Sequence, residues 1–266
     1  MENKNIICLR LHFCHLKLDN TFYKNQCKNL NEYKFIDCTS RCKEFAFDLS
    51  PFYLGPVTGP DGATASTVET FFQSGKVYPC HDDNGQPTED FFTWRNNMYS
   101  KEIGELTKDE LRHPNHLLGY EAHECVYFPW YDQETKKYTP LNYVESRKKV
   151  YIPNYAKLVA KTQTYKALKS LVDKGEKIAL ADFDAYNYYD ENAMKKKYES
   201  YVNKCKRDHI DVTYTLDDFL NIKTMKDVVN CPFIPAGHSF VVKALLQGDL
   251  EVTENNEVID HSGILD

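Results

Sequence analysis

The sequence predicts a single, predominantly helical α+β domain with a few short strands. A folded chain is expected, because 42% of its 266 residues are hydrophobic and 27% are charged. Helical patterns dominate the second half, whereas strand-like segments occur near the amino terminus and at Ile178–Ala181. We find no internal repeat, low-complexity segment or clear domain boundary.

Three regions have different characters along the chain. Residues 1–34 are expected to form an amino-terminal appendage with an apolar, strand-like start. Residues 35–251 are expected to form the main domain. The irregular segment at about 101–139 is expected to be an insertion, because loops of that length inside a compact domain are usually functional or inserted. Residues 252–266 form an acidic, loose tail.

The elements of the main domain follow from turn residues and apolar spacing. A loop rich in Pro and Gly separates one or two strands in 35–48 from a helix that ends near Gly75. Pro153 kinks or divides the helical pattern of 141–171. The later elements are a helix ending near Gly175, a buried strand at 178–181, a basic helix at about 190–206, short helices at about 215–229, and a last helix entered through Gly237.

Charge and cysteine content restrict the partners. The net charge of −6 provides no global attraction to nucleic acid, although the Lys-rich stretch 194–207 permits a local contact. The nine cysteines include no CxxC pair, so we expect reduced thiols and no metal site. No signal peptide or membrane-spanning segment is recognised, and a cytoplasmic protein is expected.

The stretch "ASTVETFFQSGKVY" (65–78) carries three polar residues on one helical stripe. Glu69, Gln73 and Lys76 stand at i, i+4 and i+7, beside enough apolar residues to hold the helix against a core. The competing structural role is a capping box in "STVE", in which Glu69 would fold back onto the start of the helix. The functional interpretation is an active site.

Two later stretches add chemistry. In "LADFDAYN" a buried strand delivers Asp182, Asp184 and Asn187 to its carboxyl end, where strands often position catalytic acids. In "AGHSF" Gly237 and His238 begin a helix, whose free N–H groups favour an anion such as phosphate.

These stretches together resemble the NADAR (YbiA-like) family. "LSPFYLGP" followed by "STVETFFQSGKVY" is similar to its amino-terminal signature, and Glu69, Gln73 and Lys76 match the signature's polar residues. "LKSLVDKGEKIALADFDAYN" and "GHSFVVKALLQ" occupy the places of its two later segments. The chain departs from the family at Pro51, after the second aspartate, and in 101–139, which leaves open whether Asp182 or Asp184 is the family aspartate.

The resemblance implies hydrolysis of the N-glycosidic bond of a nucleotide, an ADP-ribosylated base or a modified nucleic-acid base. Breaking a C1′–N bond develops positive charge on the ribose, which a carboxylate stabilises. We expect Lys76 as nucleophile or electrostatic partner, Glu69 as acid/base, and Asp182 or Asp184 as the second carboxylate. Substrate-binding residues are expected to be Ser50, Phe52, Tyr53, Gln73, Trp94, Asn187, Gly237 and His238. No cofactor is implied.

Two other functions fit the residues. An apolar strand ending in Asp182 and Asp184 also resembles the first motif of haloacid-dehalogenase-type phosphatases, which use magnesium. A non-catalytic module that binds a nucleotide or modified base would need the aromatic residues but not the lysine.

Overall fold

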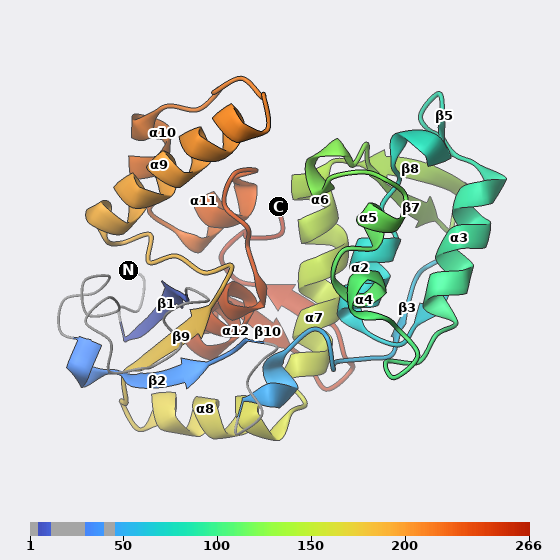
Figure 1. The fold of residues 1–266 in the computed structure, drawn as a ribbon. Coiled ribbons are helices and arrows are strands. Elements are labelled where there is room, and N and C mark those ends of the chain that lie inside the picture. The colour runs from blue at the N-terminus through green and yellow to red at the C-terminus, as the bar shows by residue number, and fades with distance from the viewer. Residues whose placement is uncertain (1–4, 12–29, 40–45) are drawn as a thin grey trace.

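A small parallel sheet organises the part of the chain that the computed structural model describes, which is residues 5–11, 30–39 and 46–266. Its strands are β1 (Ile6–Arg10), β9 (Ile178–Asp182) and β2 (Lys34–Asp37), and β9 lies in the middle (Figure 1). All five residues of β9 are buried, as expected for a central parallel strand covered on both faces. The α+β class and the strand predicted at 178–181 are confirmed.

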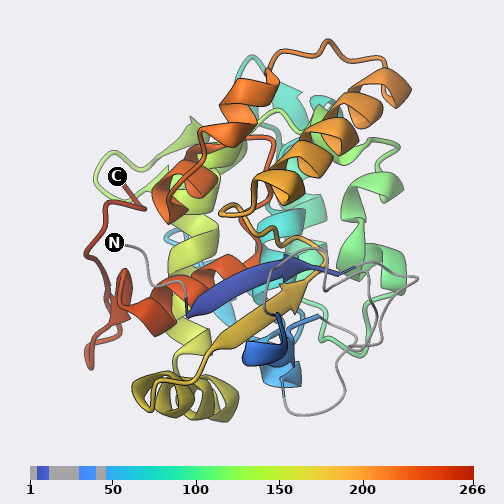
Figure 2. The ribbon, with the colours of Figure 1, turned by 90° about the vertical axis from the view of Figure 1, so that its left-hand side faces the viewer.

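The amino-terminal strand is part of this sheet, which corrects the prediction of an appendage over 1–34. β1 pairs with β9 along its whole length, from Ile6 opposite Ile178 to Arg10 opposite Asp182, and Figure 2 shows the two side by side. The strand is apolar because both its faces are buried. The rest of the predicted appendage, apart from residues 30–34, lies largely outside the described residues.

The two faces of the sheet pack differently. Alternate residues such as Ile6, Cys8 and Leu180 face the main core, where helix α12 (His238–Gln247) covers the sheet. The intervening residues, including Leu9 and Ala181, enter a smaller cluster on the other face. Asp182 continues the register of Leu180, so it ends β9 on the side of α12.

A broken helix crosses the centre of the molecule and contains Pro153. It consists of α6 (Tyr143–Ser146), a π-helical turn η5 (Arg147–Tyr151) and α7 (Ile152–Val159). Proline cannot donate a backbone hydrogen bond to the preceding turn, and the side chain of the next residue, Asn154, donates to the carbonyl of Val150 at 2.9 Å. The predicted interruption at Pro153 is therefore confirmed, in the form of a π-turn just before the proline.

The segment 101–139 is ordered and lies against α2 (Val68–Ser74), opposite the sheet across α6 and α7 (Figure 1). The expectation of an irregular region is wrong. The elements within or bordering it are α4 (Lys108–Arg112), α5 (Pro114–Leu117), η4 (Ala122–Glu124), β7 (Phe128–Asp132) and β8 (Lys137–Leu141).

The carboxyl-terminal residues are also packed, which corrects the prediction of a loose tail. β10 (Leu250–Val252) and β11 (Val258–Asp260) form a hairpin, and Ile264 is only 1% exposed. Asp260 accepts backbone hydrogen bonds from Ser262 and Leu265, which hold the last turn. An acidic side chain of this segment therefore stabilises a turn.

The remaining elements complete the framework. They are η1 (Leu30–Glu32), η2 (Phe47–Leu49), β3 (Val57–Thr58), β4 (Thr64–Ala65), η3 (Pro79–His81), β5 (Asp82–Asp83), β6 (Gln86–Pro87), α3 (Glu89–Tyr99), α8 (Gln163–Asp173), α9 (Glu191–Arg207), α10 (Leu216–Leu220) and α11 (Met225–Asn230). A second strand predicted within 35–48 is not seen at 47–48, which is helical, while 40–45 lie outside the described residues.

Candidate active site

Helix α2 begins one residue later than the predicted capping box requires. Its N-cap is Thr67, whose side chain accepts from the backbone N–H of Thr70 at 3.0 Å. The backbone N–H of Glu69 instead donates to the carbonyl of Pro51 at 3.1 Å. The capping role of Glu69 is therefore wrong, and its carboxylate is available for other contacts.

The predicted polar stripe of α2 is a connected chain of hydrogen bonds. Gln73 donates from Nε2 to Oε1 of Glu69 at 2.9 Å, and Lys76 donates from Nζ to Oε1 of Gln73 at 2.6 Å. Glu69 and Lys76 are only 9% and 8% exposed, so this is not a solvated helix face. The ammonium of Lys76 also lies 4.7 Å from the ring centroid of Phe72.

The end of β9 contacts the start of α12 through Asp182 and His238. Oδ2 of Asp182 lies 3.2 Å from Nδ1 of His238, and Nε2 of His238 lies 2.6 Å from the carbonyl oxygen of Cys38. A carbonyl can only accept, so Nε2 carries a proton and donates it. A second proton must then lie between Nδ1 and Asp182, on one atom or the other, for this contact to be attractive.

Gly237 allows the start of α12 to lie close to Asp182 and Asp184, because glycine has no side chain. A Cβ at Gly237 would lie 3.1 Å from Cβ of Asp184 and 3.2 Å from Oδ2 of Asp182. Its φ of −65° suits any residue, so the requirement for glycine is steric. The amino terminus of α12 and the two aspartates are therefore fitted closely against each other.

We predict that Gly237→Ala destabilises the fold by about 1–2 kcal/mol, because the new methyl group must push α12 from the end of β9. The measurement is the free energy of unfolding from denaturant titration. Gly104→Ala is the matched control, since a Cβ there has no heavy atom within 4 Å. Equal stabilities of the two variants would show that the close fit at Gly237 has no energetic consequence.

Charges from the three stretches act on one another. Burial raises the pKa of Glu69 above 4.5, while the hydrogen bond from Gln73 and the charges of Lys76 and His238 oppose that rise and Asp184 adds to it. Burial also raises the pKa of Asp182 to about 6, against the nearby charge of His238. The structure thus brings α2, the end of β9 and the start of α12 into one electrostatic cluster, as the sequence predicts.

Tyr151 belongs to this cluster and is missed by sequence reasoning. It is 9% exposed, and the charges of Glu69, Asp182 and Asp184 add to the burial that raises its pKa well above 10. It lies in the π-turn η5, a feature that is frequent at functional sites. Pro153 indicates in the sequence that the helix is interrupted near Tyr151, but a π-turn cannot be distinguished from a simple kink without coordinates.

The other predicted binding residues lie at different places. Ser50 is buried and accepts from the backbone N–H of Phe52, next to the start of α2, whereas Tyr53 is 49% exposed. Asn187 is buried in the turn after β9. Trp94 packs on His81 at 5.5 Å between ring centroids, and no contact given for the described residues joins it to the cluster.

The sequence profile of a family described as a family of unknown function (DUF6939) matches residues 21–199. The chain belongs to this family. Curated proteins and solved structures give no match.

The DUF6939 match covers part of the candidate site. It includes Glu69 of α2 and Lys76 just after it, Asp182 at the end of β9 and Asp184 beyond it, and it stops within α9, before His238. The description of the family names no activity, so the function must be argued from the site itself.

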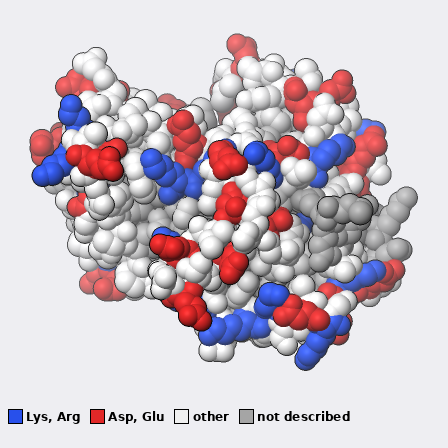
Figure 3. All heavy atoms as spheres, turned by 180° about the vertical axis from the view of Figure 1, so that it is seen from behind, with Lys and Arg blue, Asp and Glu red and all other residues white. Residues whose placement is uncertain are grey.

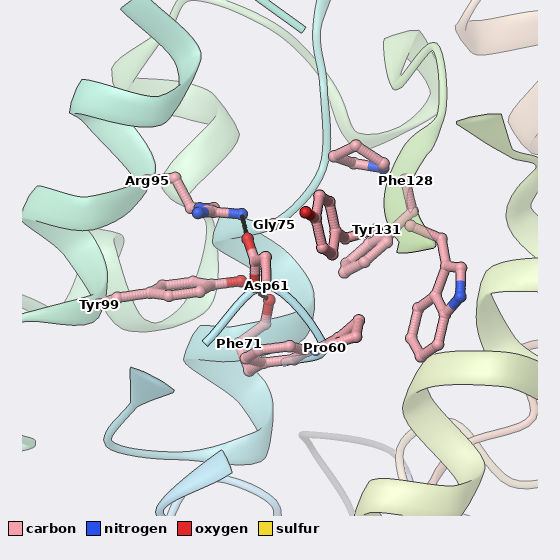
Figure 4. Close-up of a pocket in the computed structure, with 10 residues that line it drawn as sticks. Pro60, Asp61, Phe71, Gly75, Arg95, Tyr99, Phe128 and Tyr131 are labelled. Atoms are coloured by element: carbon pink, nitrogen blue, oxygen red, sulfur yellow. Dashed lines mark hydrogen bonds and ion pairs between the residues drawn. The ribbon is translucent and has the colours of Figure 1, made fainter. Parts of the chain in front are cut away.

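An open hollow of about 420 Å³ is bordered by Asp61 and Arg95. The same two residues line a smaller neighbouring pocket, where Figure 4 shows their ion pair of 2.7 Å. Phe71 of α2 and Gly75, just after it, also line that pocket. Since Arg95 is 8% exposed and also stacks on aromatic rings, we interpret this pair as structural.

Two features of the described residues bear on other classes of function. Across residues 5–11, 30–39 and 46–266, no three His, Cys, Asp or Glu side chains gather closely enough to hold a metal ion. Within the same ranges, no helix combines the length and the apolarity needed to cross a bilayer.

Proposed function

We propose that this protein is an N-glycosidase that hydrolyses the N-glycosidic bond of a nucleotide, an ADP-ribosylated base or a modified nucleic-acid base. The observation that carries the proposal is that Glu69 and Lys76 are buried and linked through Gln73, while His238, beside Asp182, and the exposed Asp184 act electrostatically on Glu69. The stretches that resemble the NADAR family are those that supply the cluster, which supports a NADAR-like fold and site.

Glu69 is the proposed general acid. Breaking the C1′–N bond leaves an electron pair on the base nitrogen, which needs a proton. A carboxyl group whose pKa is raised by burial retains a proton closer to neutral pH than an ordinary glutamic acid does. Gln73 holds its orientation through the hydrogen bond to Oε1.

Lys76 is the proposed nucleophile. Its amine nitrogen, once deprotonated, forms a bond to C1′ as the bond from C1′ to the base breaks, and Glu69 protonates the departing base. The nitrogen of this adduct carries two protons: one passes to O4′ as the C1′–O4′ bond breaks and the ring opens, and the other stays on the protonated Schiff base that then links Lys76 to C1′. Water hydrolyses this bond, which releases the sugar and restores the amine.

Asp184 is the proposed carboxylate that stabilises positive charge on the sugar. It is exposed and therefore accessible to a ligand, and its charge acts on Glu69. Asp182 is 4% exposed and committed to His238, so we assign it a positioning role. Phe52 and Tyr53, beside the start of α2, remain our candidates for stacking on the base.

Among the described residues, Cys80, Cys125, Cys205 and Cys231 are free thiols, which supports a cytoplasmic location. The basic stretch 194–207 is partly neutralised, since Lys195 pairs with Glu191 and Arg207 pairs with Asp208. On the face shown in Figure 3 acidic and basic side chains are interspersed. These features favour a small nucleotide over nucleic acid as the substrate.

The experiment that tests the proposal uses chromatography to measure the release of free base from a panel of nucleotides and ADP-ribosylated bases. We expect the rate at subsaturating substrate to fall as pH rises through the raised pKa of Glu69, because only the protonated acid is competent. The midpoint of this fall in rate should lie clearly above pH 4.5. A falling limb centred on the ordinary value would contradict the role of Glu69, and ligand binding without base release would favour a binding module.

A further inference from the structure

The ring of Tyr151 connects the two sides of the proposed active site. Its centroid lies 5.1 Å from that of Phe72 on α2, and the ammonium of Lys76 lies 4.7 Å from the same Phe72 ring. In the other direction Tyr151 stacks on Tyr155 at 6.1 Å, and Tyr155 packs on His238 at 5.8 Å between ring centroids. The turn η5 also contacts α2, while α7 contacts α12. A continuous row of rings therefore runs from the lysine to the start of α12.

The hydroxyl groups of the two stacked tyrosines differ. Tyr155 donates its hydroxyl proton to the carbonyl oxygen of Leu49 at 2.5 Å. The hydroxyl of Tyr151 makes no hydrogen bond with any residue in the described ranges, and its oxygen is not fully enclosed. Polar groups inside a protein are normally hydrogen-bonded, because an unpaired one costs free energy. A hydroxyl without a protein partner at this place is suited to contact a substrate.

Tyr151 remains protonated at neutral pH. Burial raises its pKa well above 10, and the negative charges of Glu69, Asp182 and Asp184 act in the same direction. A neutral hydroxyl can donate one proton while it accepts another. The group is therefore suited to relay a proton rather than to act as a nucleophile.

The proposed reaction contains a proton transfer that needs such a relay. In the adduct of Lys76, the nitrogen that loses a proton and O4′, which gains it, are both bonded to C1′. A direct transfer would pass through a four-membered ring, in which the N–H···O angle is far from the nearly straight geometry that hydrogen bonds prefer. Gln73 cannot serve as the relay, since its amide is hydrogen-bonded to both Glu69 and Lys76.

We propose that Tyr151 is the catalytic residue that opens the sugar ring, as a proton relay between the nitrogen of Lys76 and O4′. The hydroxyl gives its proton to O4′, which keeps the electron pair of the breaking C1′–O4′ bond. The hydroxyl oxygen receives the proton that leaves the lysine nitrogen, and the electron pair of that N–H bond forms the C=N bond. The tyrosine ends the step unchanged. This inference rests on the proposed function and adds to it a residue for the step after the base has left.

The test separates base release from ring opening in Tyr151→Phe, with nicotinamide mononucleotide and the activity panel as substrates of the full chain. We expect one equivalent of base to leave at a rate within about threefold of the parent, because the base departs before the ring opens. The steady-state rate should then fall about 100-fold or more, as when a general acid–base group is lost. Tyr155→Phe is the matched control, and it should leave the ratio of the burst rate to the steady-state rate unchanged, because its hydroxyl is bound to Leu49.

Reduction with borohydride in the presence of ribose 5-phosphate checks that Lys76 is still in place. The open-chain form of this sugar carries a free aldehyde, so it forms a Schiff base without ring opening by the protein. We expect the same reduced adduct on Lys76 in Tyr151→Phe as in the parent. Loss of this adduct in the variant would make Tyr151 a structural residue and overturn the relay.

Two kinetic results would also overturn the relay and leave the glycosidase standing. One is unchanged steady-state turnover in Tyr151→Phe, and the other is a burst rate that falls as much as the steady-state rate. Absence of base release by the parent protein with every substrate is a different result, which would refute the glycosidase proposal and the relay with it.

Discussion

Lys76→Ala should lower the rate of base release at least about 1000-fold, because the proposed covalent step then has no nucleophile. Glu69→Gln should lower it by about 100- to 10,000-fold, since the amide cannot donate a carboxyl proton to the leaving base. The measurement is single-turnover base release at saturating protein. Circular dichroism and thermal unfolding must show that both variants keep the parent fold.

Lys76→Arg distinguishes the two roles that the sequence leaves open for this residue. Arginine keeps the positive charge but does not form a Schiff base, so we expect it to be as inactive as alanine. Substantial activity in Lys76→Arg would reduce Lys76 to an electrostatic partner. Lys108→Ala and Glu89→Gln are the controls, because both residues are exposed and should leave the rate unchanged.

Arg95→Met should destabilise the fold by about 3–5 kcal/mol, which is the largest stability effect that we expect from one substitution. The substitution leaves Asp61 buried without its cation, although Tyr138 still donates to it at 3.0 Å. It also removes stacking of the guanidinium over Phe92 and Tyr99, at 5.2 and 5.4 Å from their ring centroids. Denaturant titration measures the loss.

The pH dependence of this loss provides a second check. Burial favours a higher pKa for Asp61, but the Arg95 charge and the hydrogen bonds from Arg95 and Tyr138 hold it below 3.8 in the parent protein. The parent therefore loses stability as pH falls through that lowered pKa. In Arg95→Met the cation no longer opposes the effect of burial on Asp61, so protonation of Asp61 should stabilise the variant. The difference in unfolding free energy between the parent and the variant should therefore shrink at acidic pH.

The matched control is Lys169→Met, which breaks an exposed pair with Asp173 and should cost no more than about 0.5 kcal/mol. The double variant of Arg95→Met with Asp61→Asn should recover part of the stability, because no buried charge remains. If Arg95→Met costs no more than Lys169→Met, the pair is not the structural anchor of α3 that we infer.

The sequence predicts those parts of the fold that local patterns determine. The apolar run Ile178–Ala181 is a strand whatever its neighbours, and Gly175 ends α8 with a positive φ of 82°, as a helix-terminating glycine should. The spacing of Glu69, Gln73 and Lys76 placed them on one stripe, and the structure connects them by hydrogen bonds.

Long-range contacts were the part that could not be predicted. Ile6–Arg10 reads as an isolated apolar segment, and only its pairing with β9, more than 160 residues away, makes it part of the sheet. The acidic tail reads as loose because the hairpin and the burial of Ile264 depend on partners elsewhere. For the same reason the place of Tyr151 beside the acidic residues could not be inferred from spacing alone.

Reduction with borohydride during turnover tests the central claim most directly, because it fixes a Schiff base as a stable amine. We predict that mass spectrometry of the digested protein finds a sugar adduct on the peptide containing Lys76, only when both nucleotide and borohydride are present. An adduct on a different lysine, or no adduct while base is being released, would contradict Lys76 as the nucleophile.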